Sequence, residues 1–460
     1  MASAQSGQTT LSAGESKAKA SSSTQVTGFL KFEGMQYATQ LPEQPILDQS
    51  LLVSTNLRVF GRTQVSQSVL DLTAGRYVDV GSGVWGLKEF YYQRQVLGPQ
   101  TKVSLGRKTD FWSQVDQDWQ LGLWQPKVSV DALRPEEQGL GGIFLNHQNE
   151  GWDFVSYVSP IFIPSMGPEI REKDGSLKSD SRWYKTPSST FPLNGTDTQL
   201  VYDLDVPDVG KLVSNPGAGA RLKWGGQDHG TWLAANYGYK PINSLLLRYK
   251  RKLLLPEVDP QTGEVTVSPE VGYHEIFGGD VGYSFGETGQ AVVSYLEDRP
   301  TFKLPEEPWV QQQPRNMKVI GLHLSNSFKV KGLMDPVIGS LQYLRVTTPS
   351  VLDYYSGGTE QGSIFEERSQ YTNAAQVRID TSGMVFRKRL STTFKYLREF
   401  DQKGSLYNLE LNYYPGKTIA LFTGADVLGA DDSSSNNRDT RFLNQFRAND
   451  RVYGGLNYVF

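Results

Sequence analysis

Histidine and serine are the residue types in this sequence that could supply a base and a nucleophile. The histidines, His147, His229, His274 and His323, are scattered and lack the His-Glu-x-x-His spacing that places two ligands of a catalytic zinc on one helix face. His323 shares a face of its predicted strand with Ser325 and Ser327, where a base could activate a hydroxyl. Proximity is the only argument for that chemistry, so the sequence predicts no enzyme.

Phosphate and metal chemistry have little support. Gly416-Lys417-Thr418 ends like a phosphate-binding loop, but Leu411 stands where such a loop needs its first glycine, which predicts a simple turn. The chain has no cysteine, which excludes disulfides and thiolate metal sites. One polar cluster could hold Ca²⁺ loosely but lacks the spacing of a dedicated loop, so a flexible external loop is favoured: Asp431, Asp432, Asn436, Asn437 and Asp439. We expect no cofactor and no bound metal, and the net charge of −3 gives no reason to expect a nucleic-acid partner.

The elements that would carry these residues are β-strands. In Leu406–Tyr414, apolar Tyr407, Leu409, Leu411 and Tyr413 alternate with Asn408, Glu410 and Asn412, and the same period of two recurs in most of the chain from Gln25 onward. Many of these strands exceed ten residues, longer than is usual in soluble sheets. No run of 18 apolar residues exists, so no membrane-spanning helix is expected.

Turn lengths also alternate. The connections between strands alternate between short turns and longer loops. The short turns include Pro415–Lys417, Thr381–Gly383 and Asn149–Gly151, and the longer loops include Pro160–Asp197 and Pro349–Gln370. This arrangement is typical of an all-β, transmembrane, antiparallel up-and-down β-barrel. Our tally is 20 strands, within a range of 16 to 20. It includes a strand at Gln199–Val206 and a strand between the short turn Lys240–Asn243 and the loop Pro256–Pro269.

The ends of the chain suggest export. Ala2-Ser3-Ala4 matches the end of a signal peptide, so we expect a mature exported protein with its signal removed. Residues 1–24 are rich in Ser, Ala, Gln and Lys and are predicted to be disordered, followed by a single barrel over residues 25–460. The location expected for such a barrel is the outer membrane of a Gram-negative cell.

The last strand carries the most specific motif. Arg451–Phe460 ends in an aromatic residue, with Tyr458, Leu456 and Val452 spaced by two before it. Gly455, Tyr458 and Phe460 fill the places of a pattern that resembles the C-terminal assembly signal of outer-membrane barrels. The resemblance implies recognition by the barrel-assembly machinery and contact with outer-membrane lipid and lipopolysaccharide.

A second, local resemblance covers about residues 70–110. Leu72–Arg76 and Val103–Arg107 each end a short apolar strand in Gly-Arg, and Lys88-Glu89-Phe90-Tyr91 lies between them. This resembles the early strands of alginate-export-type barrels and some porins. It implies a large outer-membrane channel without indicating its substrate.

The third long connection, Thr109–Gln138, has the position and length of the loop that narrows the lumen of general porins. We predict that its acidic and aromatic residues form a constriction: Asp110, Trp112, Asp116, Asp118, Trp119, Trp124, Asp131, Glu136 and Glu137. They would face a basic lumen wall: Arg58, Arg62, Arg378, Arg387, Arg389 and Lys395. Two alternatives stay open, that the Trp residues belong to an outer girdle and that the arginines only stiffen the wall. The loop could also contain a further strand at Trp119–Val128.

The sequence therefore predicts a porin that lets small hydrophilic solutes diffuse across the outer membrane. A lumen of mixed charge favours this function modestly over polysaccharide export, which calls for one sign of charge. A surface adhesin or phage receptor built on the long loops is a further alternative. Assembly as a homotrimer is left open by the sequence.

Overall fold

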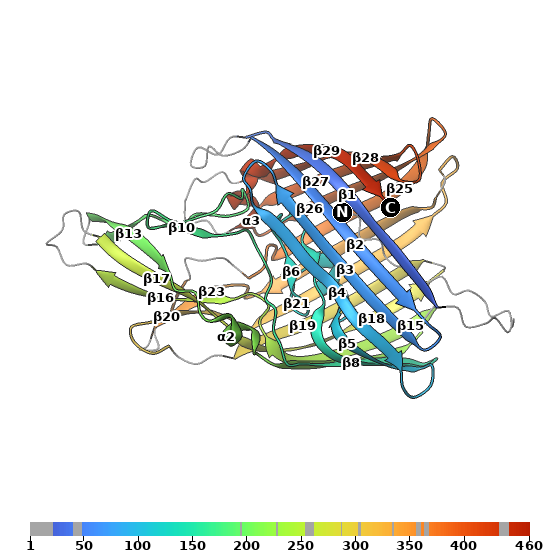
Figure 1. Ribbon diagram of the computed structural model, residues 1–460, viewed down its shortest axis with the longest axis horizontal. Coiled ribbons are helices and arrows are strands. Elements are labelled where there is room, and N and C mark those ends of the chain that lie inside the picture. Colours follow the sequence, from blue (N-terminus) through green and yellow to red (C-terminus); the bar gives the residue numbers. More distant parts are fainter. Residues whose placement is uncertain are drawn as a thin grey trace.

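The computed structural model describes most of the chain, namely residues 22–39, 48–193, 196–226, 229–253, 262–286, 288–301, 305–333, 335–355, 360–362, 368–431 and 441–460. Its main feature is a closed β-barrel of 18 strands (Figure 1). The barrel strands are β1 (Ser23–Tyr37), β2 (Gln49–Arg62), β3 (Ser66–Tyr77), β4 (Gly83–Gln95), β5 (Thr101–Lys108), β8 (Leu140–Gln148), β9 (Trp152–Ser159), β14 (Gly217–Gly225), β15 (Gly230–Pro241), β18 (Tyr273–Phe285), β19 (Gly289–Thr301), β21 (Met317–Phe328), β22 (Val337–Thr347), β25 (Asn373–Val385), β26 (Lys388–Glu399), β27 (Gly404–Tyr414), β28 (Ile419–Ala430) and β29 (Arg451–Val459).

Every barrel strand pairs antiparallel with the one before it, and β29 closes the ring on β1 with Phe32 opposite Leu456. The predicted up-and-down barrel is thus confirmed, with a strand number inside the predicted range. None of the helices in the described residues is long and apolar enough to cross a membrane. β1 already begins at Ser23, so the last two residues of the segment predicted to be disordered belong to a strand, and residues 1–21 lie outside the description.

The two faces of the wall follow the predicted alternation. On β27, Tyr407 and Leu409 are exposed on the outside. Asn408 and Glu410 face inward, where Asn408 donates to Asp426 of β28 and Glu410 accepts from Tyr453 of β29. On β25, Val377 and Ile379 are exposed. Closure of the ring leaves no unpaired strand edge, and the outer face is apolar. A lipid environment requires both properties.

Two predicted barrel strands lie elsewhere, which explains the tally of 20. The strand predicted at Gln199–Val206 is β13 (Thr196–Leu204), which pairs in parallel with β17 (Thr262–Glu270). Lys240–Asn243 is not a short turn, because β15 pairs directly with β18 and a hairpin of β16 (Leu246–Leu253) and β17 is inserted between them. The two strands predicted for the barrel, β13 and β16, therefore belong to a second sheet of seven strands.

The second sheet is built from the long connections and projects beyond one end of the barrel (Figure 1). Its remaining strands are β12 (Thr190–Leu193), β20 (Val310–Pro314), β23 (Val351–Tyr355) and β24 (Glu360–Gly362). It has its own buried apolar cluster, which includes Tyr202, Tyr249, Val265, Val267 and Val310. Short elements complete the long connections: α2 (Val209–Val213), β10 (Arg171–Lys173), β11 (Ser176–Lys178), α3 (Phe442–Gln445) and the 3₁₀ turn η1 (Arg447–Asn449).

Candidate constriction site in the lumen

The connection between β5 and β8 folds into the barrel and reaches opposite walls. We call Thr109–Gln138 the constriction segment. It contains α1 (Gln114–Trp119) and a two-residue ladder of β6 (Lys127–Val128) and β7 (Glu136–Glu137). At one end it bonds to Asp280 on β18, and at the other to Glu33 on β1. β1 is the first and β18 the tenth strand of the ring of 18, so the segment contacts diametrically opposite walls.

Aromatic stacking holds the first contact. The rings of Trp112 and Trp124 stack with centroids 4.6 Å apart, and Tyr157 of β9 meets Trp112 edge-on at 5.2 Å. Trp112 and Trp124 are both buried. Gly238 on β15 makes the seat possible, because a Cβ there would lie 2.8 Å from the Trp124 ring. Burial of such large rings makes this the main apolar anchor of the segment.

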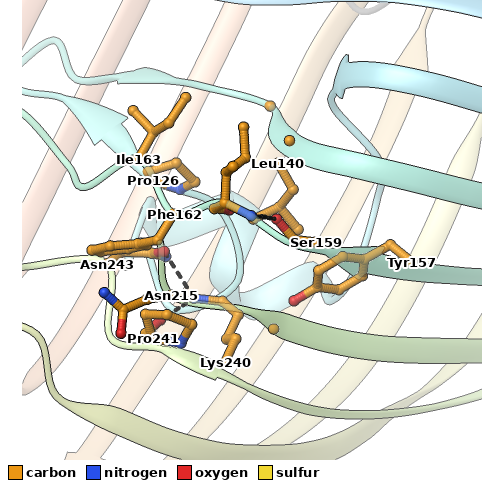
Figure 2. Close-up of a pocket in the computed structure, with 14 residues that line it drawn as sticks. Pro126, Leu140, Tyr157, Ser159, Phe162, Ile163, Asn215, Lys240, Pro241 and Asn243 are labelled. Carbon is orange, nitrogen blue, oxygen red and sulfur yellow. Dashed lines mark hydrogen bonds between the residues drawn. The ribbon is translucent and has the colours of Figure 1, made fainter. Parts of the chain in front are cut away.

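Hydrogen bonds fix the segment on the same side. Asn236 of β15 donates to the Trp112 carbonyl at 3.0 Å. Asn243, two residues after β15, donates to the carbonyls of Gly122 and Leu123 at 2.7 and 3.1 Å. The Lys240 amine donates to Asn243 and to the Pro241 carbonyl at 2.8 and 2.9 Å (Figure 2). These residues line a pocket with about 340 Å³ of empty space, part of it open to solvent. The bonds from Asn236 and Asn243 therefore fix the chain just before and just after α1.

The acidic residues of α1 have structural partners. The Asp116 carboxylate accepts the backbone N–H groups of Leu123 and Trp124 at 3.1 and 2.9 Å, which folds the segment back on itself. Burial raises the pKa of Asp116 against the lowering effect of these two donors. Asp118 contacts His323 of β21 at 2.8 Å. α1 lies so close to β21 that a Cβ at Gly321 would come 2.4 Å from the Val115 side chain.

Ion pairs hold the opposite contact. Arg134 bonds to Glu33 of β1 at 2.6 Å and approaches Asp426 of β28 at 3.5 Å, and its guanidinium lies 3.9 Å from the Tyr453 ring. Asp131 pairs with Arg451 of β29 at 2.8 Å. These groups surround the seam where the first and last strands meet.

A cavity separates the segment from the wall next to this seam. Its empty space is about 660 Å³, part of it open to solvent. Strands β1–β4 form one side and Val128–Glu136 the other, with polar and charged lining from Lys31, Glu33, Ser54, Thr73, Asp131 and Glu136. A polar gap of this kind between segment and wall is a candidate path for a solute.

The remaining predicted acids are partly buried within the segment. Asp110 pairs with Lys108 of β5 at 2.9 Å. Glu136 and Glu137 form β7 and are half-buried, and burial together with the charge of Asp116 raises the pKa of Glu137 to about 7. Trp119 meets Tyr371 edge-on inside the barrel. The three tryptophans of the segment therefore face the lumen interior rather than an outer girdle, and Trp119–Val128 contains the end of α1 and not a further barrel strand.

The predicted basic wall is dispersed. Arg58 lies near Asp71 and Glu89 of its own wall at 3.9 and 4.0 Å. Arg378 pairs with Asp380 on the same strand, and Arg389 with Asp335 near the short-turn rim. Lys395 faces inward, in register with Arg378 and Asn408. Arg62 ends β2. The turn between β25 and β26 lies at Phe386–Arg387 and not at the predicted Thr381–Gly383, which belongs to β25, so Arg387 is not a wall residue.

Acids of the predicted constriction do reach the wall, Asp118 at His323 and Asp131 at Arg451, but these partners are not the predicted basic residues. Within the described residues, no ion pair links an acid of the segment to a residue of the predicted basic wall. The groups that sequence reasoning missed are Lys31, Glu33, Arg134, Asp426, Arg451 and Tyr453. Inward charge at Lys31 and Glu33 was a usable signal, but their partners depend on the ring closure.

Sequence reasoning also missed one motif. Gly282-Tyr-Ser-Phe-Gly286 has the Gly-x-Ser-x-Gly spacing of a nucleophile elbow. It ends β18 and turns into β19, with Ser284 opposite Gln290 and no helix after it, so it lacks the strand–turn–helix context of that motif.

The polar cluster after Asp431 lies outside the described residues, and Asp431 itself pairs with Arg398. No group of metal-ligating side chains is found in the part of the chain that is described.

The terminal motif sits in the closing seam. Phe460 exchanges two backbone hydrogen bonds with Gly28 of β1, at 2.9 and 3.0 Å. Tyr458 and Phe460 are exposed on the outside of the barrel. Gly455 lies opposite Glu33, where a Cβ would collide with the Phe32 carbonyl. The role of these residues in assembly stays a prediction.

No protein-family model and no curated protein matches the sequence. Solved structures are similar over most of the chain. OccK11 (OpdR) of Pseudomonas aeruginosa is 10% identical with a TM-score of 0.45, covering 95% of this chain and 96% of that one. A variant of the Rh. blastica porin is 10% identical with a TM-score of 0.39, covering 95% and 100%. Wzi of Escherichia coli, an outer membrane protein described as a carbohydrate-binding β-barrel, is 11% identical with a TM-score of 0.42, covering 95% and 84%. Likeness at this level carries no argument about activity, and the barrel fold is established by its own strand pairing.

Proposed function

We propose that the chain is an outer-membrane channel through which small hydrophilic solutes diffuse past the constriction segment. The observation that carries the proposal is the polar cavity between Val128–Glu136 and the inner face of β1–β4. A segment anchored on opposite walls divides the lumen, so a solute has to pass beside it. Groups of both signs line this gap, which suits polar solutes of either charge better than one charged polymer.

The outer surface supports a membrane location. Exposed apolar side chains recur on the outward positions of strands around the ring, for example Val293 on β19, Ile320 on β21 and Leu421 on β28. An apolar band of this kind on a closed barrel is the surface that lipid accommodates. Outer-membrane residence, export after removal of a signal peptide, and contacts with lipopolysaccharide and the barrel-assembly machinery follow as part of the proposal.

Single-channel conductance in planar bilayers tests the channel. We expect the full chain to conduct, and removal of Trp112–Glu136 to increase the conductance because the segment obstructs the lumen. A heat-modifiable band in gel electrophoresis shows that each variant has folded into a barrel. A folded wild type that never conducts would refute the channel, and unchanged conductance after the deletion would refute the constriction. Liposome swelling with sugars and amino acids then ranks the solutes.

A second function, surface recognition by an adhesin or phage receptor, is favoured by the seven-stranded sheet. The long connections fold into one structure with a buried cluster around Tyr249, more than loops need if they only join strands. Trypsin treatment of whole cells tests the exposure of the seven-stranded sheet, with cleavage expected near the exposed Arg171 and Lys173.

Polysaccharide export is less favoured, because the lumen mixes charges, as in the Arg378–Asp380 pair. Trimer formation stays a prediction.

A further inference from the structure

The contact between α1 and β21 places three side chains in the order of a hydrolase triad. The Asp118 carboxylate lies 2.8 Å from Nδ1 of His323, and Nε2 of His323 lies 3.1 Å from the hydroxyl of Ser325. Each nitrogen therefore faces the partner it has in a Ser-His-Asp triad. The residues come from two segments some 200 positions apart, so only the folded segment brings Asp118 to the pair.

The protonation of His323 follows from its neighbours. Asp118 accepts, so Nδ1 carries the proton and Nε2 is free to accept from the Ser325 hydroxyl. Gln342 also approaches Nδ1, at 3.4 Å, but its amide is a donor and the contact is longer. Asp118 is itself oriented by Gln114, which donates to its other oxygen at 2.9 Å. The Gln114 amide thus fixes the orientation of the Asp118 carboxylate.

The surroundings leave the hydroxyl within reach of the lumen. Ser325 is half-buried on the inner face, whereas the side chains of His323 and Asp118 are only 12% and 10% exposed. Its neighbours in register are Gln290 on β19 and Ser340 on β22, both polar. The Gln290 amide, in register with Ser325, is a candidate donor for an oxyanion formed there.

We propose that Ser325, His323 and Asp118 form an esterase site in the lumen that acts on short carboxylic esters. Ser325 Oγ attacks the ester carbonyl while its proton passes to Nε2 of His323. The carbon–oxygen bond to the alcohol then breaks, and the alcohol leaves with that proton. Water attacks the acyl-serine by the same route, its proton passing through His323 to Ser325 as the carboxylic acid is released. This activity differs from the sequence-based prediction of no enzyme and does not depend on whether the channel conducts.

Labelling with a small alkyl fluorophosphonate tests the nucleophile in the folded full chain. We expect loss of fluoride and a phosphonyl adduct on Ser325, located by mass spectrometry. Ser327→Ala is the matched control, because Ser327 lies on the same face two residues on but bonds to Thr288 instead. Wild type and Ser327→Ala should label equally, and Ser325→Ala should not label. Absence of an adduct on folded wild type, or equal labelling of Ser325→Ala, would overturn the proposal.

Hydrolysis of 4-nitrophenyl acetate tests the relay. His323→Gln and Asp118→Asn should each lower the rate over background by roughly a hundredfold or more, because general-base catalysis contributes at least that much. Each variant must keep its heat-modifiable band. If instead these contacts only anchor α1, both substitutions would change conductance while the wild-type rate equals that of Ser325→Ala, and the esterase is refuted.

Discussion

Arg134 holds the constriction segment against the wall at the seam between β1 and β29, and its contacts determine how much free energy this attachment contributes. Its guanidinium bonds to Glu33 and lies 3.5 Å from Asp426, whose side chains are only 1% and 2% exposed, so both carboxylates are buried. Replacing one member of a buried ion pair typically costs about 3–5 kcal/mol. Here each carboxylate retains another cation, Lys31 at 2.6 Å for Glu33 and Arg451 at 2.7 Å for Asp426. We therefore expect Arg134→Gln to weaken the anchor by about 2–3 kcal/mol.

A loss of this size should raise the population in which the segment has left the seam by roughly 30- to 150-fold, at about 1.4 kcal/mol per tenfold. The chain has no cysteine, so a single thiol can report on that population. Val128 lies in the segment and is 7% exposed, so Val128→Cys should react slowly until the segment moves. The rate of labelling by a maleimide then follows the open fraction.

The matched control is Arg345→Gln. Arg345 also bonds to a carboxylate, Asp401 at 2.7 Å, but both side chains are more than 40% exposed. Exposed pairs contribute about 0–1 kcal/mol, so labelling should change less than about fivefold. If Arg134→Gln leaves the labelling rate within threefold of its parent, or if the control rises as much, the ion pairs at the seam do not anchor the segment.

Further predictions concern the other parts of the site. Trp124→Ala should lower the stability of the folded barrel by about 3–5 kcal/mol, measured as a lower temperature for the shift of the heat-modifiable band, because a buried stacked ring is lost. Gly321→Val should increase single-channel conductance, because its side chain would overlap Val115 and displace α1. Deleting Phe460 should reduce the yield of heat-modifiable barrel in the outer membrane, since two closing hydrogen bonds are lost. Cation selectivity should rise between pH 6 and 8, because Glu137 is neutral below its pKa of about 7 and anionic above it, and Glu137→Gln should abolish this rise. Because folding raises this pKa from 4.5, the stability that protonated Glu137 contributes is present below pH 4.5 and is lost as the pH rises through 7.

Local patterns predicted the wall well because the inward or outward direction of a side chain depends on its own strand. The alternation around Tyr407 and Leu409 needs no knowledge of neighbouring strands, and a slip by one residue would bury the wrong face. The failures at β13 and β16 have a physical cause. Strands of a second sheet show the same period of two, and nothing local says which sheet a strand joins.

The candidate site was predictable in location but not in partners. The length and aromatic content of Thr109–Gln138 indicated a segment that folds inward, and it does so. Its partners depend on the closure of the ring, which brings Glu33 beside Asp426 although almost 400 positions separate them. No sequence pattern singles out Arg134, and its role follows only from its position between Glu33 and Asp426 in the closed ring. Likewise, His323 and Ser325 were recognisable as neighbours, whereas Asp118 required the folded segment.

The two anchors of the segment differ in kind, and this determines which side can open. Three tryptophans are buried on the side of β9–β22, and displacing any one of them exposes a large apolar area at a cost of several kcal/mol. On the side of β1 and β29 the contacts are ion pairs, and charges that leave them can be solvated because the cavity beside them is partly open to solvent. Release at the seam therefore costs less than release at the aromatic seat. We infer that the segment pivots on Trp112 and Trp124, and that widening begins between Val128–Glu136 and β1–β4, where the cavity already lies.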